Sequence, residues 1–162
     1  MNALVDSSAL YALTIAEDLH HAQAVACFEE LQRLEASLAT TNYVLLECVT
    51  LVQRRYGMGH AQGLLKRAEA WLDVLWIGSQ EHEQALKLWM TAGRRALSLV
   101  DCTSMVMMRQ HRIPRVVAFD RHFAEAGFEM LPQADRVAER RAGYRTGRTH
   151  GTRIPSVSKK QW

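Results

Sequence analysis

Long apolar runs are absent from this 162-residue chain, and cysteine is scarce. A membrane-spanning helix needs about 20 consecutive apolar residues, and the first apolar stretch here ends after three residues at Asp6. The N-terminus also lacks the basic segment and the unbroken apolar segment of a secretory signal. We therefore expect a soluble, cytoplasmic protein that does not enter a membrane.

Cysteine and histidine patterns typical of metal sites are missing as well. Cys27, Cys48 and Cys102 are scattered and form no CxxC pair, which argues against a zinc site and against a disulfide framework. We interpret them as small buried apolar residues. The seven histidines show no ligand spacing, since the adjacent His20 and His21 would point in different directions on a helix.

Length and charge instead suggest one domain followed by a basic tail. With 48% hydrophobic residues, the chain is long enough to bury one core. Residues 136–162 contain eight Lys or Arg and one acidic residue, a net of +7, whereas the other 135 residues carry 12 basic and 16 acidic residues, a net of −4. We predict a domain over 1–135 and a tail over 136–162 that is disordered in isolation and typical of an interaction segment.

Apolar periodicity in the body predicts strands that alternate with helices. Short bulky runs predict the strands, at 3–5, 38–40, 72–77, 115–119 and 129–131. Segments with helical spacing lie between them, with Thr41 or Asn42 as one cap, Ser79 and Asp101 as two others, and Gly57, Gly59 and Gly93 as ends. This alternation implies an α/β fold with a parallel sheet covered by helices on both faces.

Three aspartates take matching positions in this pattern. Asp6 and Asp120 each follow a predicted strand, and Asp101 follows Leu-Val and opens a helix. Because ligands of open α/β sheets bind outside the carboxyl ends of the strands, these acids can meet in space. Glu47 lies on a helix among apolar neighbours, where a charge is costly to bury unless it is paired or bound to a metal.

Such acids have two interpretations. Converging carboxylates repel one another, which raises their pKa values or creates a site for a divalent cation. Oxygen ligands alone suit Mg²⁺ or Mn²⁺, and a metal-bound water is easier to deprotonate for attack on a phosphodiester. The structural alternatives are helix caps for Asp6 and Asp101, a turn residue at Asp120 and an exposed helix charge at Glu47. The residues alone leave both interpretations open.

Four segments in order resemble the PIN-domain nucleases. They are LVDSSAL at 4–10, NYVLLE at 42–47, LSLVDCTS at 97–104 and VVAFDRHF at 116–123. Together they are most similar to the VapC-like ribonuclease toxins of bacterial type II toxin–antitoxin pairs. The resemblance implies a three-layer α/β/α sandwich with a central parallel sheet and an Mg²⁺- or Mn²⁺-dependent endoribonuclease. It also implies an RNA substrate, a cognate VapB-like antitoxin and a homodimer.

The resemblance also implies which residues carry the chemistry. The main metal ligands of the family match Asp6 and Asp101, and its remaining catalytic acids match Glu47 and Asp120. Hydroxyls that match family positions near the metal are Ser8, Thr103 and Ser104. Helix capping explains these hydroxyls equally well. We expect the metal ligands to hold a phosphate oxygen and the attacking water, and Glu47 or Asp120 to orient or deprotonate that water.

Other basic residues leave further alternatives open. The tail departs from the family pattern and is either an RNA-binding arm or a solvated extension. Arg54-Arg55 and Arg94-Arg95 are candidate phosphate contacts, although solvated helix faces are the simpler interpretation. Arg121 is a candidate RNA contact, and His122 is either a general acid or, as we favour, a structural histidine. A PIN nuclease of RNA processing without an antitoxin, or a non-catalytic PIN-like binding module, are the competing functions.

Overall fold

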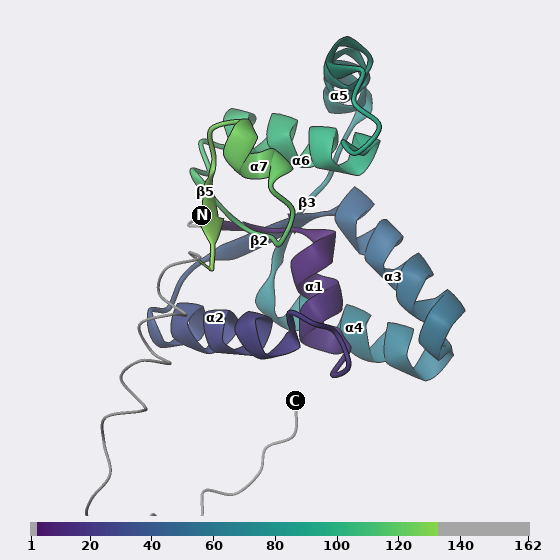
Figure 1. Cartoon of the computed structure of the whole chain (residues 1–162), viewed down its shortest axis with the longest axis vertical. Helices are drawn as coiled ribbons and strands as arrows, with labels where there is room; N and C mark the ends of the chain where they lie inside the picture. The colour runs from purple at the N-terminus through teal and green to yellow at the C-terminus, as the bar shows by residue number, and fades with distance from the viewer. Residues whose placement is uncertain (1–2, 133–162) are drawn as a thin grey trace, which may run out of the picture. The chain divides into compact units, whose positions relative to one another are not determined.

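A computed structural model describes residues 3–132 of the chain, and its centre is a five-stranded parallel sheet (Figure 1). The strands are β1 (Ala3–Val5), β2 (Leu38–Thr41), β3 (Asp73–Leu75), β4 (Arg115–Val117) and β5 (Glu129–Leu131). Their order is β3-β2-β1-β4-β5. The central strand β1 pairs in parallel with β2 and β4 and is buried along its whole length. A strand covered on both faces is apolar without alternation, as the sequence ALV shows.

Seven helices accompany the sheet in the described residues. They are α1 (Ser7–Thr14), α2 (His21–Arg33), α3 (Asn42–Tyr56), α4 (Met58–Trp71), α5 (Ser79–Ala92), α6 (Leu99–Gln110) and α7 (His122–Glu125). Successive side chains of a strand point to opposite faces. Accordingly, Ala3 and Val5 pack in one core with α1 to α4, and Leu4 packs in a second core with α5 to α7.

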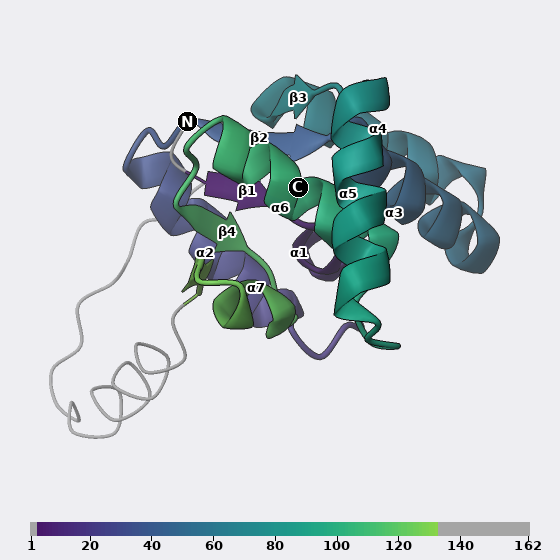
Figure 2. The same cartoon turned by 90° about the horizontal axis from the view of Figure 1, so that it is seen from above.

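The sheet is therefore the middle layer of an α/β/α sandwich, and the predicted fold class is confirmed. Figure 1 shows α6 and α7 on one side of the sheet and α1, α2 and α4 on the other. Seen from above, α5 lies beside α6 on its side of the sheet (Figure 2).

Several predicted helix boundaries are confirmed, and three are wrong: Gly59, Ser79 and Asp101. Thr41 caps α3, because its hydroxyl accepts from the Val44 N–H at 3.1 Å, and Gly93 ends α5 in a left-handed conformation. Gly57, at φ 84°, alone separates α3 from α4, so Gly59 lies inside a helix. Gly78 precedes α5 in place of the predicted cap Ser79, and its N–H donates to the Glu81 carboxylate at 3.0 Å.

The longest described helix, α3, has 15 residues. Within residues 3–132, no helix combines the length and the apolar character that crossing a membrane requires. The prediction of a basic tail over 136–162 falls outside the described residues and stays a prediction.

Candidate active site

Asp6 stands where the central strand β1 runs directly into α1. Its Oδ2 accepts from the Ser8 N–H at 3.1 Å and from the Ser8 hydroxyl at 2.8 Å, so Asp6 does cap α1. The side chain is nevertheless only 2% exposed, and its Oδ1 has no hydrogen-bond partner in the part of the chain that the structure describes. Burial raises the pKa of Asp6 to about 6; the Ser8 bonds oppose the rise and the Asp101 charge adds to it. A helix cap needs neither this burial nor a free oxygen.

Asp101 is also buried, but the sequence misplaced it. Asp101 was predicted to cap a helix, but it is the third residue of α6, whose cap is Ser98. The reason is that Leu97 and Leu99 pack against the core under α5 and α6, so the apolar run LSLV fills that core and starts the helix. Burial raises the pKa of the Asp101 carboxyl, Ser98 opposes the rise, and the charge of Asp120 adds to it.

Ser98 fixes the Asp101 carboxylate, and sequence analysis missed it. The Asp101 Oδ2 accepts from the Ser98 N–H at 2.8 Å, and the Ser98 Oγ accepts from the Asp101 N–H at 3.0 Å. This reciprocal pair is a capping box, and the spacing Ser-x-x-Asp before a helix was the signal that predicts it. One carboxylate oxygen of Asp101 is thus held by the backbone.

Ser8 links Asp6 to the loop after β4. Its hydroxyl donates to the Asp6 Oδ2 and accepts from the Phe119 N–H at 3.1 Å. The Phe119 ring in turn stacks on His20 with ring centroids 4.3 Å apart. Ser8 therefore sets the distance between the N-terminal end of α1 and the loop that leads to Asp120.

Replacing Ser8 by Ala is expected to cost about 1–2 kcal/mol of unfolding free energy, because the Phe119 N–H loses its acceptor. It should also shift the pH dependence of any activity that needs an ionised Asp6 to higher pH, because the Ser8 hydroxyl lowers the pKa of Asp6. Urea denaturation and a pH–rate profile measure both effects. Ser7→Ala is the matched control, and equal effects of the two substitutions would contradict this role of Ser8.

Asp120 lies three residues beyond the end of β4, not at the predicted strand end, because the chain turns at Phe119 to bond Ser8. Its side chain is 47% exposed, and its Oδ1 lies 3.1 Å from His122 Nε2. His122 is nearly buried, and its Nδ1 lies 3.9 Å from Glu125, which pairs with Arg94 at 2.6 Å. This arrangement favours the structural interpretation of His122, since the imidazole holds Asp120 in place.

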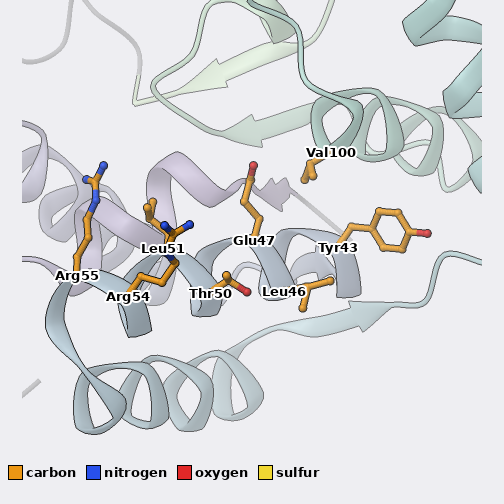
Figure 3. Close-up of a pocket in the computed structure, with 8 residues that line it drawn as sticks. All are labelled: Tyr43, Leu46, Glu47, Thr50, Leu51, Arg54, Arg55 and Val100. Atoms are coloured by element: carbon orange, nitrogen blue, oxygen red, sulfur yellow. The ribbon is translucent and has the colours of Figure 1, made fainter.

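Glu47 is half-buried on α3 and lines a cavity of about 560 Å³ (Figure 3). The lining residues are Tyr43, Leu46, Glu47, Thr50, Leu51, Arg54, Arg55 and Val100. Val100 directly precedes Asp101 on α6, and Glu47 is the one member of the four acids that lines the cavity. Burial, the Asp6 charge and the Glu47 charge together raise the pKa of the Cys48 thiol to about 12. The charges of Asp6, at the N-terminal cap of α1, and of Glu47, on α3, therefore both raise the pKa of the same buried thiol.

The two hydroxyls on α6 differ. Thr103 donates to the Val100 carbonyl at 2.7 Å, which is a local helix bond. The Ser104 Oγ is buried and has no partner among the described residues. Ser104 lies three residues after Asp101 and therefore on the same side of α6.

The donor set fits a cation that needs few protein ligands. Within residues 3–132, no three Asp, Glu, His or Cys side chains converge into a metal-binding group. The structure instead brings together the buried pair Asp6 and Asp101, with a free Oδ1 on Asp6, while Glu47 and Asp120 lie at the margin. Mg²⁺ keeps several waters and commonly uses only one or two carboxylates. The pair therefore suits Mg²⁺ better than a cation that needs a full protein cage.

Comparison with known proteins identifies the family of this α/β/α body. The PIN domain model matches residues 3–129. The chain belongs to the PIN-domain family. Over 135 residues it is 35% identical to the 23S rRNA-specific endonuclease VapC20 of Mycobacterium tuberculosis, covering 80% of this chain and 98% of VapC20. The predicted resemblance to VapC-like PIN domains is thereby confirmed.

Solved structures agree with this placement of the PIN domain. The crystal structure of M. tuberculosis VapC20, a sarcin–ricin loop cleaving toxin, superposes with a TM-score of 0.69 at 32% identity, covering 78% of this chain and 96% of VapC20. VapBC2 from Rickettsia felis, bound to a DNA fragment from its promoter, gives a TM-score of 0.61 at 10% identity, covering 80% of this chain and 97% of that one. This second likeness shows the fold alone.

Proposed function

We propose that the chain is a divalent-metal-dependent endoribonuclease and the toxin of a VapBC-type toxin–antitoxin pair. The observation that carries the proposal is Asp6, a nearly fully buried carboxylate with a free oxygen beside Asp101, in a PIN domain 35% identical to an rRNA endonuclease. A buried, unpaired carboxylate costs stability, and a cation bound during catalysis explains its presence.

Asp6 and Asp101 are the proposed ligands of Mg²⁺ or Mn²⁺, which when bound supplies a Lewis acid for a phosphate oxygen and lowers the pKa of a bound water. Ser8 and Ser98 each hold one oxygen of these carboxylates and so fix their orientation. The Asp6 Oδ1 stays available for a ligand. Ser104 is a candidate to hold a nearby water through its unpartnered hydroxyl.

Two acids are candidates for moving the proton of the attacking water. Glu47 faces the cavity beside Val100, and Asp120 is held by His122 at the margin of the site. In either case the carboxylate accepts a proton from the water while the water oxygen attacks phosphorus and the phosphodiester P–O bond to the leaving oxygen breaks. In Figure 3, Glu47 projects from the side of α3 that faces Val100.

The proposal extends to partners and location. Because VapC20 is named as specific for 23S rRNA, 23S rRNA is the first substrate to test. We further propose that a VapB-like antitoxin inhibits the enzyme, and that the chain forms a homodimer and acts in the cytoplasm. A short upstream reading frame for a DNA-binding protein would favour the toxin over an RNA-processing nuclease.

The test is induction of the full chain in bacterial cells, followed by sequencing of RNA 5′ ends. We expect growth arrest and a small set of new RNA ends, both absent when Asp6→Asn is induced to the same level. Coexpression of the upstream reading frame should suppress both effects. The same RNA ends in the wild type and in Asp6→Asn would contradict the proposal.

A further inference from the structure

The C-terminal half of α3 carries two arginines, and we propose that Arg54 and Arg55 hold backbone phosphates of the RNA next to the cleaved one. This inference rests on the proposed function, because it names how the substrate of that site is held. It assigns the cavity along α3 to a single-stranded RNA segment.

The cavity runs from Glu47, one of the four candidate acids, to the two arginines. Glu47, Leu51 and Arg54 recur at intervals of four and three residues, which places them along one face of α3. Val100 lies across the cavity from them and borders Asp101 (Figure 3). Seven residues of α-helix span roughly 10 Å, and stacked nucleotides are about 3.4 Å apart along a strand. Arg54 therefore lies within about three nucleotides of Glu47.

The two positive charges at the end of the cavity formed by Arg54 and Arg55 have no carboxylate partner within residues 3–132. Arg54 and Arg55 are exposed, and neither forms an ion pair with a carboxylate of residues 3–132. Arg94, another of the basic candidates from the sequence, is instead paired with Glu125 at 2.6 Å. An RNA strand whose scissile phosphate lies at the acids would place its neighbouring phosphates near these two guanidinium groups, neither of which has a carboxylate partner in the described part of the chain. Arginine suits this role because its planar donors match phosphate oxygens.

Arg55 is already held in place by Tyr11 of α1. Its Nη1 donates to the Tyr11 hydroxyl at 3.1 Å, and its guanidinium carbon lies 5.9 Å from the centroid of the Tyr11 ring. The Tyr11 hydroxyl also lies 3.2 Å from that of Tyr56. Two basic residues at the C-terminal end of α3 could simply interact favourably with the helix dipole. That interaction, however, requires neither the contact between Arg55 and Tyr11 nor a cavity that the arginines share with Glu47.

The test measures RNA binding by the full chain in an Asp6→Asn background, which prevents cleavage. The probe is a fluorescein-labelled RNA hairpin that carries the sarcin–ricin loop sequence, titrated at several salt concentrations. We expect Arg54→Gln to weaken binding about tenfold, the size of one charge-assisted hydrogen bond. The slope of log K against log salt should fall by about 0.7, the value for one lost single-strand phosphate contact.

Lys87→Gln is the matched control, because it removes one positive charge from an exposed position on α5. Equal effects of Arg54→Gln and Lys87→Gln, or no change in the salt slope, would overturn the inference. So would normal RNA binding together with lost antitoxin binding, which would assign the surface to a protein. If the wild type cleaves RNA while Arg54→Gln binds it normally, the inference fails and the proposed function stands. If the wild type cleaves no RNA, the proposed function fails by itself.

Discussion

The Asp6→Asn variant is expected to lose RNA cleavage by roughly a thousandfold or more, because removing a metal ligand forfeits several kcal/mol of transition-state stabilisation. In EDTA at pH 7.5, the same variant should unfold at a higher temperature than the wild type. The physical reason is that the wild type buries an ionised carboxylate whose Oδ1 has no partner within residues 3–132.

The pKa of Asp6 sets the size and the pH dependence of this stability gain. A pKa of about 6 in the folded protein, against an ordinary value of 3.8, corresponds to about 3 kcal/mol. Because the buried amide of Asn also lacks a partner, we expect a net gain of about 1–2 kcal/mol, or roughly 4–8 °C.

The advantage of Asp6→Asn over the wild type should depend on pH with a definite sign. Because the folded pKa is the higher one, protonation of Asp6 stabilises the wild type. The advantage should therefore be full above about pH 6, shrink as the pH falls, and reverse to a disadvantage of about 1–2 kcal/mol below about 3.8, where only the cost of the unpartnered Asn amide remains. Asp73→Asn, an exposed change of the same kind at the start of β3, should leave both melting temperature and cleavage unchanged. A destabilised Asp6→Asn at pH 7.5 would contradict the site described here.

The second large effect concerns the metal itself. Adding Mg²⁺ or Mn²⁺ to the wild type should raise its melting temperature, by about 2.7 kcal/mol in free energy at 100 times the dissociation constant. The shift should grow as the pH rises through about 6, because Asp6 must lose its proton to bind the ion. Differential scanning fluorimetry at constant ionic strength measures it.

Two controls separate metal binding from charge screening. Asp6→Asn and Asp101→Asn should show little metal-dependent shift, and EDTA should reverse the shift of the wild type. NaCl at equal ionic strength should have a small effect, since it only screens. Equal metal shifts in the wild type and in Asp6→Asn would mean that the ion binds elsewhere.

The fold was predictable because its signals are periodic. Three residues of β1 followed at once by Asp6 define a buried strand that enters a helix, and the alternation repeats along the chain. Asp101 was misplaced because an apolar run such as LSLV reads equally well as a strand or as the start of a buried helix. The spacing Ser98-x-x-Asp101 and the packing of this run under α5 and α6 together decide for the helix.

The sequence proposed which acids make up the candidate site, but it did not indicate how they differ in burial. The four acids stay a prediction, and the burial of Asp6 and Asp101 against the exposure of Asp120 depends on where the loop after β4 turns. Ser8 fixes that turn through a bond to Phe119, which lies 111 residues away and leaves no local signal. Likewise, the free Arg54 and the paired Arg94 are equivalent in sequence and differ only in the fold.

The most direct test is cleavage of purified 23S rRNA by the purified full chain with Mg²⁺ or Mn²⁺, with cut sites mapped by primer extension. We predict discrete cuts in the presence of metal, none after EDTA is added, and none with Asp101→Asn at the same concentration. Cuts that persist in EDTA, or that Asp101→Asn makes at the wild-type rate, would contradict a metal-dependent nuclease site at Asp6 and Asp101.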